Sequence, residues 1–375
     1  MTIGGGATVG DVGAACDASG TYTVLPAVKE LGYTGFALGG GAGWTSGLLG
    51  FAVDQFLEVQ VVLATGEMVV ASNDSNRDLF FAVKGAGYNF GVIIEVKIQV
   101  RGLRSKVYFG TIVYPPSSFE AVFEASEWFT EHQQKDTSLA LVYVTVGPSG
   151  EPAKSIVAFP YYHGGNEAEG HRRFKKLLEI PNIQQKVGLD WFSRTSDSTP
   201  EAVWPFTRRY AHGMQFTKLT PKIWLPVLRV MRDWVTDDPS RSIGTSMFLG
   251  FYDWSTVLAN TGPGFDSAWP IRTPPSDGER SWRDCAIYIS TDKKEDEKIA
   301  LETAERVASV LREKHEEVTG EPLQPPAYYP NGSLLPGTTG EYIFGSNYGR
   351  LRKIKAKYDP QDVFHKKHPI KPDFS

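Results

Sequence analysis

One glycine-rich stretch, GFALGGGAGWTSGLLGFAVDQ at residues 35–55, limits how this chain can fold more than any other feature. It contains three consecutive glycines, Gly39, Gly40 and Gly41, and no proline. Ordered glycine costs backbone entropy, so a folded chain keeps such a run where something must approach the bare α-carbons closely or where the backbone turns sharply. The residues alone leave two alternatives open: a tight turn between two elements, or a surface where backbone N–H groups meet a cofactor.

Two further glycine clusters, GGGATVG near the start and KGAGYNFG at residues 84–91, are weaker versions of the same feature. No cluster follows the strand–GxGxxG–helix pattern of dinucleotide-binding folds, and the chain has no GxxxxGK[ST] phosphate loop. Taken one at a time, these clusters therefore do not identify a cofactor.

Length and charge restrict the class of protein. The 375 residues exceed one ordinary hydrophobic core, which predicts two domains. A net charge of −4 gives little attraction for nucleic acid, and no apolar run approaches the ~18 residues of a membrane span. Cys16 and Cys285 lie too far apart in the sequence to indicate a disulfide framework or a zinc site. We therefore expect a soluble globular chain with no nucleic-acid or membrane partner and no metal.

Hydrophobic periodicity predicts several elements. The stretch LEVQVVLATGEMVVAS at 57–72 indicates a β-hairpin, and GVIIEVKIQV at 91–100 indicates a strand that buries Val92, Ile94, Val96, Ile98 and Val100 on one face. Ser117, Ser118 and Glu120 indicate a capping box for a helix through Trp128. A second helix is predicted near Pro226, and residues 295–322 give the clearest helix, with a stop at Gly320.

The order of the motifs is more specific than any one of them. GFALGGGAGWTSGLLGFAVDQ, VQVVLATGEMVVAS and DLFFAVKGAGYNFGVI follow one another as in the flavin domain of berberine-bridge-enzyme-like FAD-linked oxidoreductases, of the vanillyl-alcohol-oxidase type. YYPN followed by FGSNYGRLRKIKAKYDPQDVF resembles that family's closing segment, and SAWPIR at 267–272 is a fainter match. The resemblance covers residues 1 to about 366.

This resemblance implies an α+β fold. Residues 1–102 would form the second half of a PCMH-type FAD-binding domain that is incomplete at the N-terminus. Residues 103–322 would form a substrate-binding domain of antiparallel sheet covered by helices. Residues 323–375 would be the C-terminal berberine-bridge-type segment that returns to the FAD domain.

The resemblance also implies roles for individual residues. The glycines that would line the FAD by backbone contact are Gly35, Gly39, Gly40, Gly41 and Gly43. Asp54 would tie this loop to its supporting strand, and Gly91 and Val92 would lie beside the cofactor. Asn331 matches an asparagine that reaches the edge of the flavin ring.

Tyr329 is the candidate catalytic base, because it matches a tyrosine at the boundary between flavin and substrate. A phenol with an ordinary pKa near ~10 must have that pKa lowered to act near neutrality. The alternative is a tyrosine that packs on the flavin and donates a hydrogen bond at its rim. His163, His212, Tyr252 and Asp253 are further candidate bases with less support.

Two departures from the family bear on the cofactor. Relatives carry an earlier segment with an Arg-Ser-Gly-Gly-His-type loop, whose histidine often bonds covalently to the flavin, and this sequence does not contain that loop. Many relatives also have a Gly-x-Cys stretch, and the matching residues here, TVLPAVKELGY, contain no cysteine. Any FAD is therefore expected to be bound non-covalently.

The expected reaction is hydride transfer from a small, hydrophobic, secondary-metabolite-type substrate to flavin N5, with reoxidation by O2. Two alternatives remain: a flavin-free descendant that binds or cyclises a small molecule, and an inactive product of a clipped gene model. Relatives are often secreted, but this sequence shows no signal peptide, so the compartment stays open.

Overall fold

The structure is a computed structural model that describes residues 1–103, 105–146, 152–197, 208–260, 262, 264–270, 281–323, 330–331 and 338–375. It confirms the predicted α+β class. Within these ranges the strands form sheets of four, seven and two strands, and neighbours within each sheet are antiparallel. Among the described residues, no helix has the length and apolar character needed to cross a membrane.

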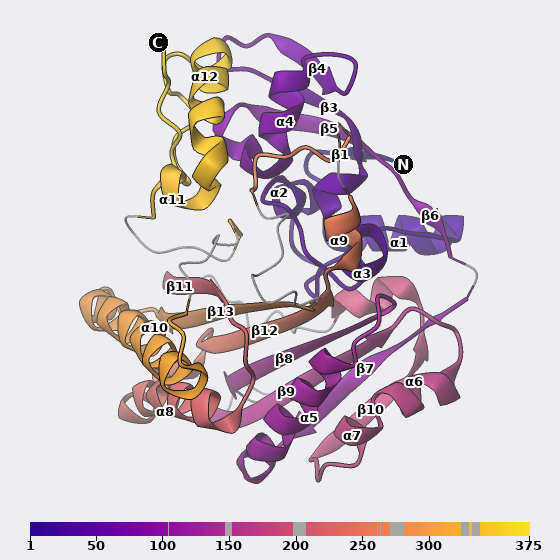
Figure 1. Cartoon of the computed structure of the whole chain (residues 1–375), viewed down its shortest axis with the longest axis vertical. Helices are drawn as coiled ribbons and strands as arrows, with labels where there is room; N and C mark the ends of the chain where they lie inside the picture. Colours follow the sequence, from indigo (N-terminus) through magenta and orange to yellow (C-terminus); the bar gives the residue numbers. More distant parts are fainter. Residues whose placement is uncertain are drawn as a thin grey trace.

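The N-terminal part is built on the four-stranded sheet (Figure 1), in the order β1-β5-β3-β4. Its strands are β1 (Thr2–Gly4), β3 (Phe56–Val62), β4 (Met68–Ser72) and β5 (Val92–Ile98), and the small sheet pairs β2 (Thr21–Tyr22) with β6 (Arg101–Gly102). The helices of this part are α1 (Val9–Ser19), α2 (Tyr33–Leu38), α3 (Ser46–Leu49) and α4 (Arg77–Ala86). The predicted hairpin is confirmed as β3 and β4.

The predicted face of β5 is wrong in its first half. Ile93, Val96 and Ile98 are buried, whereas Val92 and Ile94 are 55% and 39% exposed. The pairing of β5 with β3 shifts by one residue between Glu95 and Ile93, which is a β-bulge. An extra residue reverses which side chains face the core on one side of the bulge, so simple alternation fails there.

The seven-stranded sheet has the order β10-β7-β9-β8-β12-β13-β11. Its strands are β7 (Val107–Tyr114), β8 (Thr137–Val146), β9 (Pro152–Tyr162), β10 (Gln184–Asp190), β11 (Arg208–Gln215), β12 (Ser246–Asp253) and β13 (Ser281–Thr291). One face packs under helices α5 (Phe119–Glu131), α8 (Pro221–Asp237) and α10 (Glu297–Thr319). Side chains of the other face, such as Phe109 and Val142, join the core of the N-terminal part. Successive residues along each strand therefore point to opposite faces of the sheet and pack into two different cores.

Helix predictions in this region have mixed outcomes. The helix at α10 is confirmed, and Gly320 ends it with a φ of +76°. The capping box is wrong, because the Ser118 hydroxyl donates to the Pro181 carbonyl instead of capping α5. Helix α8 begins at Pro221, and Pro226 lies inside it. The remaining short helices here are α6 (Glu167–Arg173), α7 (Lys175–Leu178) and α9 (Ser255–Ala259).

The chain crosses between the two parts more than once. Helices α11 (Gly340–Phe344) and α12 (Tyr348–Tyr358) return to the N-terminal part, where α12 lies against α4 (Figure 1). Helix α9 lies against α3, and residues 264–270 contact α4. Residues 255–260 and 264–270 thus pack on the N-terminal part, although they fall within the range 103–322 assigned to the substrate-binding domain.

Candidate functional site

The glycine stretch forms a loop between α2 and α3. Gly40 and Gly41 have φ values of +103° and +80°, a left-handed backbone that side chains rarely tolerate. Their carbonyls accept hydrogen bonds from the backbone N–H groups of Val53 (3.1 Å) and Ala52 (2.8 Å). The loop is therefore held against the short turn that leads into β3.

Asn331, from the YPN motif, reaches this loop from the far end of the chain. Its Nδ2 donates to the carbonyl of Phe36 at 2.8 Å. A Cβ added at Gly39 would lie 2.0 Å from Asn331 Oδ1, so only glycine allows the amide to sit this close. The structure thus brings together two of the predicted site elements, the glycine loop and Asn331.

Trp269, from the SAWPIR motif, joins the same place. A Cβ at Gly40 would lie 2.6 Å from the Trp269 ring, and a Cβ at Gly85 would lie 2.8 Å from the Trp269 nitrogen. The neighbouring Ala268 N–H donates to the Lys84 carbonyl at 2.8 Å. Four motifs on which the resemblance rests, the glycine loop, KGAG, SAWPIR and YPN, therefore converge at one point.

The glycines of the loop differ in what lies over their α-carbons. Ala52 and Phe36 cover Gly41, and the Leu25 carbonyl would lie 2.3 Å from a Cβ at Gly43. Gly35 is different, because it is exposed and nothing lies within 4 Å of the Cβ position. Close packing of protein against protein explains Gly39 to Gly43 in this structure, and their contact with a flavin stays a prediction.

Asp54 lies at the end of the turn before β3 and is 7% exposed. Its Oδ2 accepts from the Phe51 N–H at 2.9 Å and lies 3.4 Å from Asn260 Nδ2. These bonds connect the turn to α9. Gly91 packs on β3, where a Cβ would lie 2.5 Å from Val61 Cγ1, and Val92 is exposed at the start of β5. Neither residue contacts Gly39 or Asn331 in the part of the chain that is described.

Tyr329 and the side chain of His212 lie outside the described residues. His163 is half-buried just after the end of β9, where its Nδ1 lies 2.7 Å from the Tyr161 hydroxyl. Burial lowers the pKa of His163 to about 4. Asp253 accepts from the Ser255 N–H at 3.0 Å as a turn residue. Hydrogen bonds within the fold therefore account for His163 and Asp253.

A polar group that sequence reasoning missed lies beside Asn331. His368 Nε2 lies 3.1 Å from the Pro330 carbonyl, and the Tyr88 ring lies 6.1 Å from the His368 ring. The Lys367 ammonium stands over the Tyr88 ring at 5.4 Å. Burial lowers the pKa of His368 to about 4 and that of Lys367 to about 8. No periodicity in HKKHPI distinguishes these residues from a solvated charge run.

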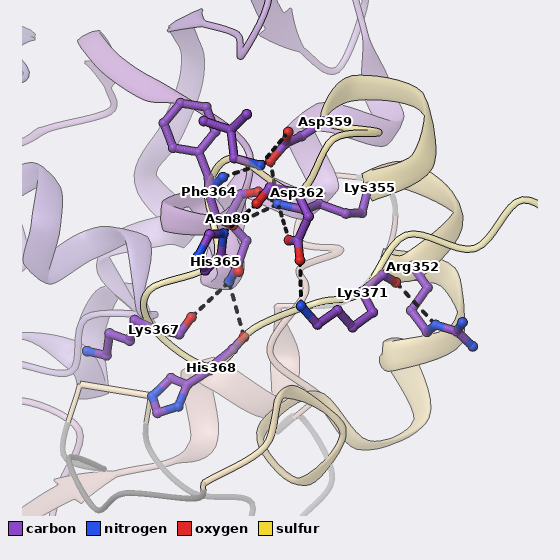
Figure 2. Close-up of polar contacts among 11 residues, drawn as sticks. Asn89, Arg352, Lys355, Asp359, Asp362, Phe364, His365, Lys367, His368 and Lys371 are labelled. Carbon is purple, nitrogen blue, oxygen red and sulfur yellow. Dashed lines mark hydrogen bonds and ion pairs between the residues drawn. The ribbon is translucent and has the colours of Figure 1, made fainter.

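A buried ionic network fixes this region to α12 (Figure 2). Lys355, fully buried, pairs with Asp359 at 2.5 Å and donates to the Asn89 carbonyl at 2.7 Å. Asn89 Nδ2 donates to the carbonyls of Lys367 (3.2 Å) and His368 (3.3 Å). The network therefore positions both Tyr88, which precedes Asn89, and the segment that carries Lys367.

The residues from Gly35 to Asn331 differ in how open they are. Gly35 leaves open space, whereas the Phe36 carbonyl and the Asn331 amide bond to each other and the Asn331 amide covers Gly39. A planar ring lying directly on Gly40 would occupy the volume of the Trp269 side chain. The face of Gly40 is therefore closed to a flavin ring, and contact of the edge from Gly35 to Asn331 with a flavin stays a prediction.

Comparisons with known proteins show what this chain is similar to. Residues 329–371 match the family model described as "Berberine and berberine like". The FAD-linked oxidoreductase pgmH of Aspergillus terreus is 29% identical over 391 residues, which cover 99% of this chain and 75% of that protein. (R)-6-hydroxynicotine oxidase of Paenarthrobacter nicotinovorans is 39% identical over 118 residues, which cover 32% of this chain and 26% of the enzyme.

A solved structure shows the same fold. The crystal structure of 6-hydroxy-D-nicotine oxidase from Arthrobacter nicotinovorans superposes with a TM-score of 0.74 at 20% identity, over 99% of this chain and 78% of that chain. The predicted PCMH-type fold class is therefore confirmed.

Proposed function

We propose that this chain, which is similar to berberine-bridge-type FAD-linked oxidoreductases, oxidises a small, hydrophobic, secondary-metabolite-type substrate with O2 as electron acceptor. When bound, FAD supplies the redox chemistry by accepting hydride at N5. The protein's contribution is to bind and orient both molecules, to exclude water, and to take one proton from the substrate. We assign that proton transfer to Tyr329.

One observation supports this proposal above the others: Asn331 lies on Gly39 and donates to the Phe36 carbonyl, although it is 295 residues away from Phe36. In our proposal this edge, with Gly35, contacts the flavin. Asp54 holds the loop against α9, and Gly91 and Val92 contact the cofactor farther along.

The binding of FAD is proposed to be non-covalent. Attachment through cysteine needs an accessible thiolate. Cys16 and Cys285 are both free and buried. Burial raises the pKa of Cys16 to about 11, so its thiol is a poor nucleophile at neutral pH.

A cluster of aromatic side chains packs beside the loop. The Phe51 ring lies 4.7 Å from the Trp269 ring and 5.6 Å from the Trp254 ring. All three rings are buried in the hydrophobic core, so they support the loop and do not themselves select a substrate. The hydrophobic substrate is proposed on the name of one relative, (R)-6-hydroxynicotine oxidase.

The test is to incubate the purified protein with FAD, pass it through gel filtration and record the visible spectrum of the protein peak. We expect flavin absorption bands to elute with the protein. Anaerobic addition of an oxidisable aromatic amine or alcohol from a panel should bleach these bands, and air should restore them. A protein peak without flavin bands would contradict the proposal.

A second candidate function is a flavin-free protein that binds a small molecule. The Trp269 ring over Gly40 favours it, because the space that a flavin ring would need there is filled. The same gel-filtration experiment separates the two candidate functions. Only the second predicts a protein peak without flavin from a protein that still binds an aromatic ligand.

A further inference from the structure

Lys367 has an unusual setting for a lysine. Its side chain is only partly exposed, its ammonium lies 5.4 Å from the centre of the Tyr88 ring, and it has no carboxylate partner among the described residues. Figure 2 shows the side chain directed away from the Lys355 network. Lysine ammonium groups are strongly hydrated, so withdrawing one from water without a counter-charge is unfavourable.

Tyr88 adds a second unsatisfied group at the same place. Its hydroxyl is buried and has no hydrogen-bond partner among the described residues. A buried polar group without a partner costs free energy unless a ligand or water satisfies it. An ammonium over the ring and a hydroxyl on that ring are both donors, and among the described residues the hydroxyl has no acceptor.

The backbone around these donors is held firmly. Asn89 Nδ2 donates to the carbonyls of Lys367 and His368, and the Asn89 carbonyl accepts from buried Lys355. On its other side, His368 contacts the Pro330 carbonyl, next to Asn331. The backbone that carries the two donors is therefore held in place, and His368 connects it to Pro330, which precedes Asn331.

We propose that Lys367 and the Tyr88 hydroxyl form a binding site for an oxyanion. The ammonium neutralises the negative charge, and the phenol donates a hydrogen bond to a second oxygen. Phosphate and carboxylate share this chemistry. The oxyanion is either a phosphate of the flavin nucleotide or a carboxylate of the small-molecule ligand, and the first of these sources rests on the proposed function.

The lowered pKa of Lys367, to about 8, agrees with a cation that lacks a counter-charge. Burial is its physical cause, and a neighbouring anion acts in the opposite direction by favouring the charged form.

The experiment measures oxyanion binding to the flavin-free protein by isothermal titration calorimetry. Its probes are inorganic pyrophosphate and benzoate, each compared with chloride at equal ionic strength. We expect at least one probe to bind in preference to chloride. Lys367→Gln should weaken that binding roughly 10- to 100-fold, as loss of a charged hydrogen bond does. Tyr88→Phe should weaken it about fivefold.

Lys366→Gln is the matched control, because Lys366 is adjacent in sequence and exposed. It removes the same charge and should leave affinity within about twofold, the size expected of an exposed charge. Tyr88→Phe should melt no lower than the parent protein, since it removes a buried hydroxyl without a partner. If neither probe binds, or if Lys367→Gln binds as the parent does, the proposal is wrong.

A second arm identifies the source of the oxyanion. If it is the flavin phosphate, Lys367→Gln lowers the affinity for FAD and FMN and leaves the affinity for riboflavin unchanged. If it is a ligand carboxylate, all three flavin affinities are unchanged and only benzoate binding is lost. Failure of every flavin to bind contradicts the proposed function, while the pyrophosphate and benzoate titrations still decide the oxyanion site.

Discussion

Replacing Lys355 with methionine tests whether the buried network holds the C-terminal segment in place. The substitution keeps the length of the side chain and removes its charge. Lys355 and Asp359 are both 0% exposed, and their charged atoms lie 2.5 Å apart. Burial alone raises the pKa of Asp359, but the Lys355 ammonium and two backbone N–H groups outweigh burial and lower it. Asp359 therefore stays ionised and loses its counter-charge in the variant.

The size of the effect follows from this burial. Removing one partner of a buried ion pair costs about 3–5 kcal/mol. An unfolding entropy of about 2.1 cal/mol/K per residue gives about 0.8 kcal/mol/K for 375 residues. For a single unfolding transition, we expect the melting temperature to fall by about 4–6 °C.

The assay is thermal unfolding followed by circular dichroism at neutral pH. Lys353→Met is the matched control, because Lys353 lies on the same helix and is exposed. It should change the free energy of unfolding by less than about 0.5 kcal/mol. Equal melting temperatures for the two variants would refute the assignment of Lys355 as a buried anchor.

Three further predictions concern the loop and its surroundings. Gly40→Ala should lower the free energy of unfolding by at least about 2 kcal/mol, because its φ is +103° and the new methyl group would meet the Trp269 ring. Gly35→Ala should change that free energy by less than about 1 kcal/mol, because the Cβ position is open. Denaturant titration measures both effects. Asp54→Ala should cost about 1–2 kcal/mol in the same assay, because the Phe51 N–H loses its acceptor. The pKa of His368 is lowered to about 4 by burial, so folding excludes a proton that the unfolded chain binds below about pH 6.5. The free energy of unfolding should therefore fall as the pH drops from about 6.5 toward 4, and His368→Gln should make that fall smaller. If the free energy of unfolding of the wild-type protein stays constant over this pH range, His368 is not a buried neutral imidazole.

The predictable elements are those whose signal is local. The hairpin of β3 and β4 and the long helix α10 follow from side-chain alternation, helical periodicity and a terminal glycine, all within a few residues of one another. The α+β class and the return of the C-terminal segment follow from the order of several motifs. None of these predictions requires knowing which distant segments of the chain contact one another.

The predictions that were wrong, and the residues that were missed, depend on contacts between segments far apart in the sequence. A bulge against β3 exposes Ile94, and the carbonyl of Pro181 binds the hydroxyl of Ser118, so neither outcome is visible in the local pattern. The residues that cover the glycine loop, Trp269 and Asn331, come from segments more than 200 positions away. Lys367 looks like one of several surface lysines until Tyr88 is placed against it.

An experimental structure determined after soaking the protein with FAD tests the central claim most directly, which is that the edge formed by Gly35, Gly39 and Asn331 contacts a flavin. We predict electron density for the isoalloxazine ring beside Gly35, within hydrogen-bond distance of the Asn331 amide. A flavin bound elsewhere, with Asn331 still donating to the Phe36 carbonyl and Gly35 open to solvent, would contradict the account.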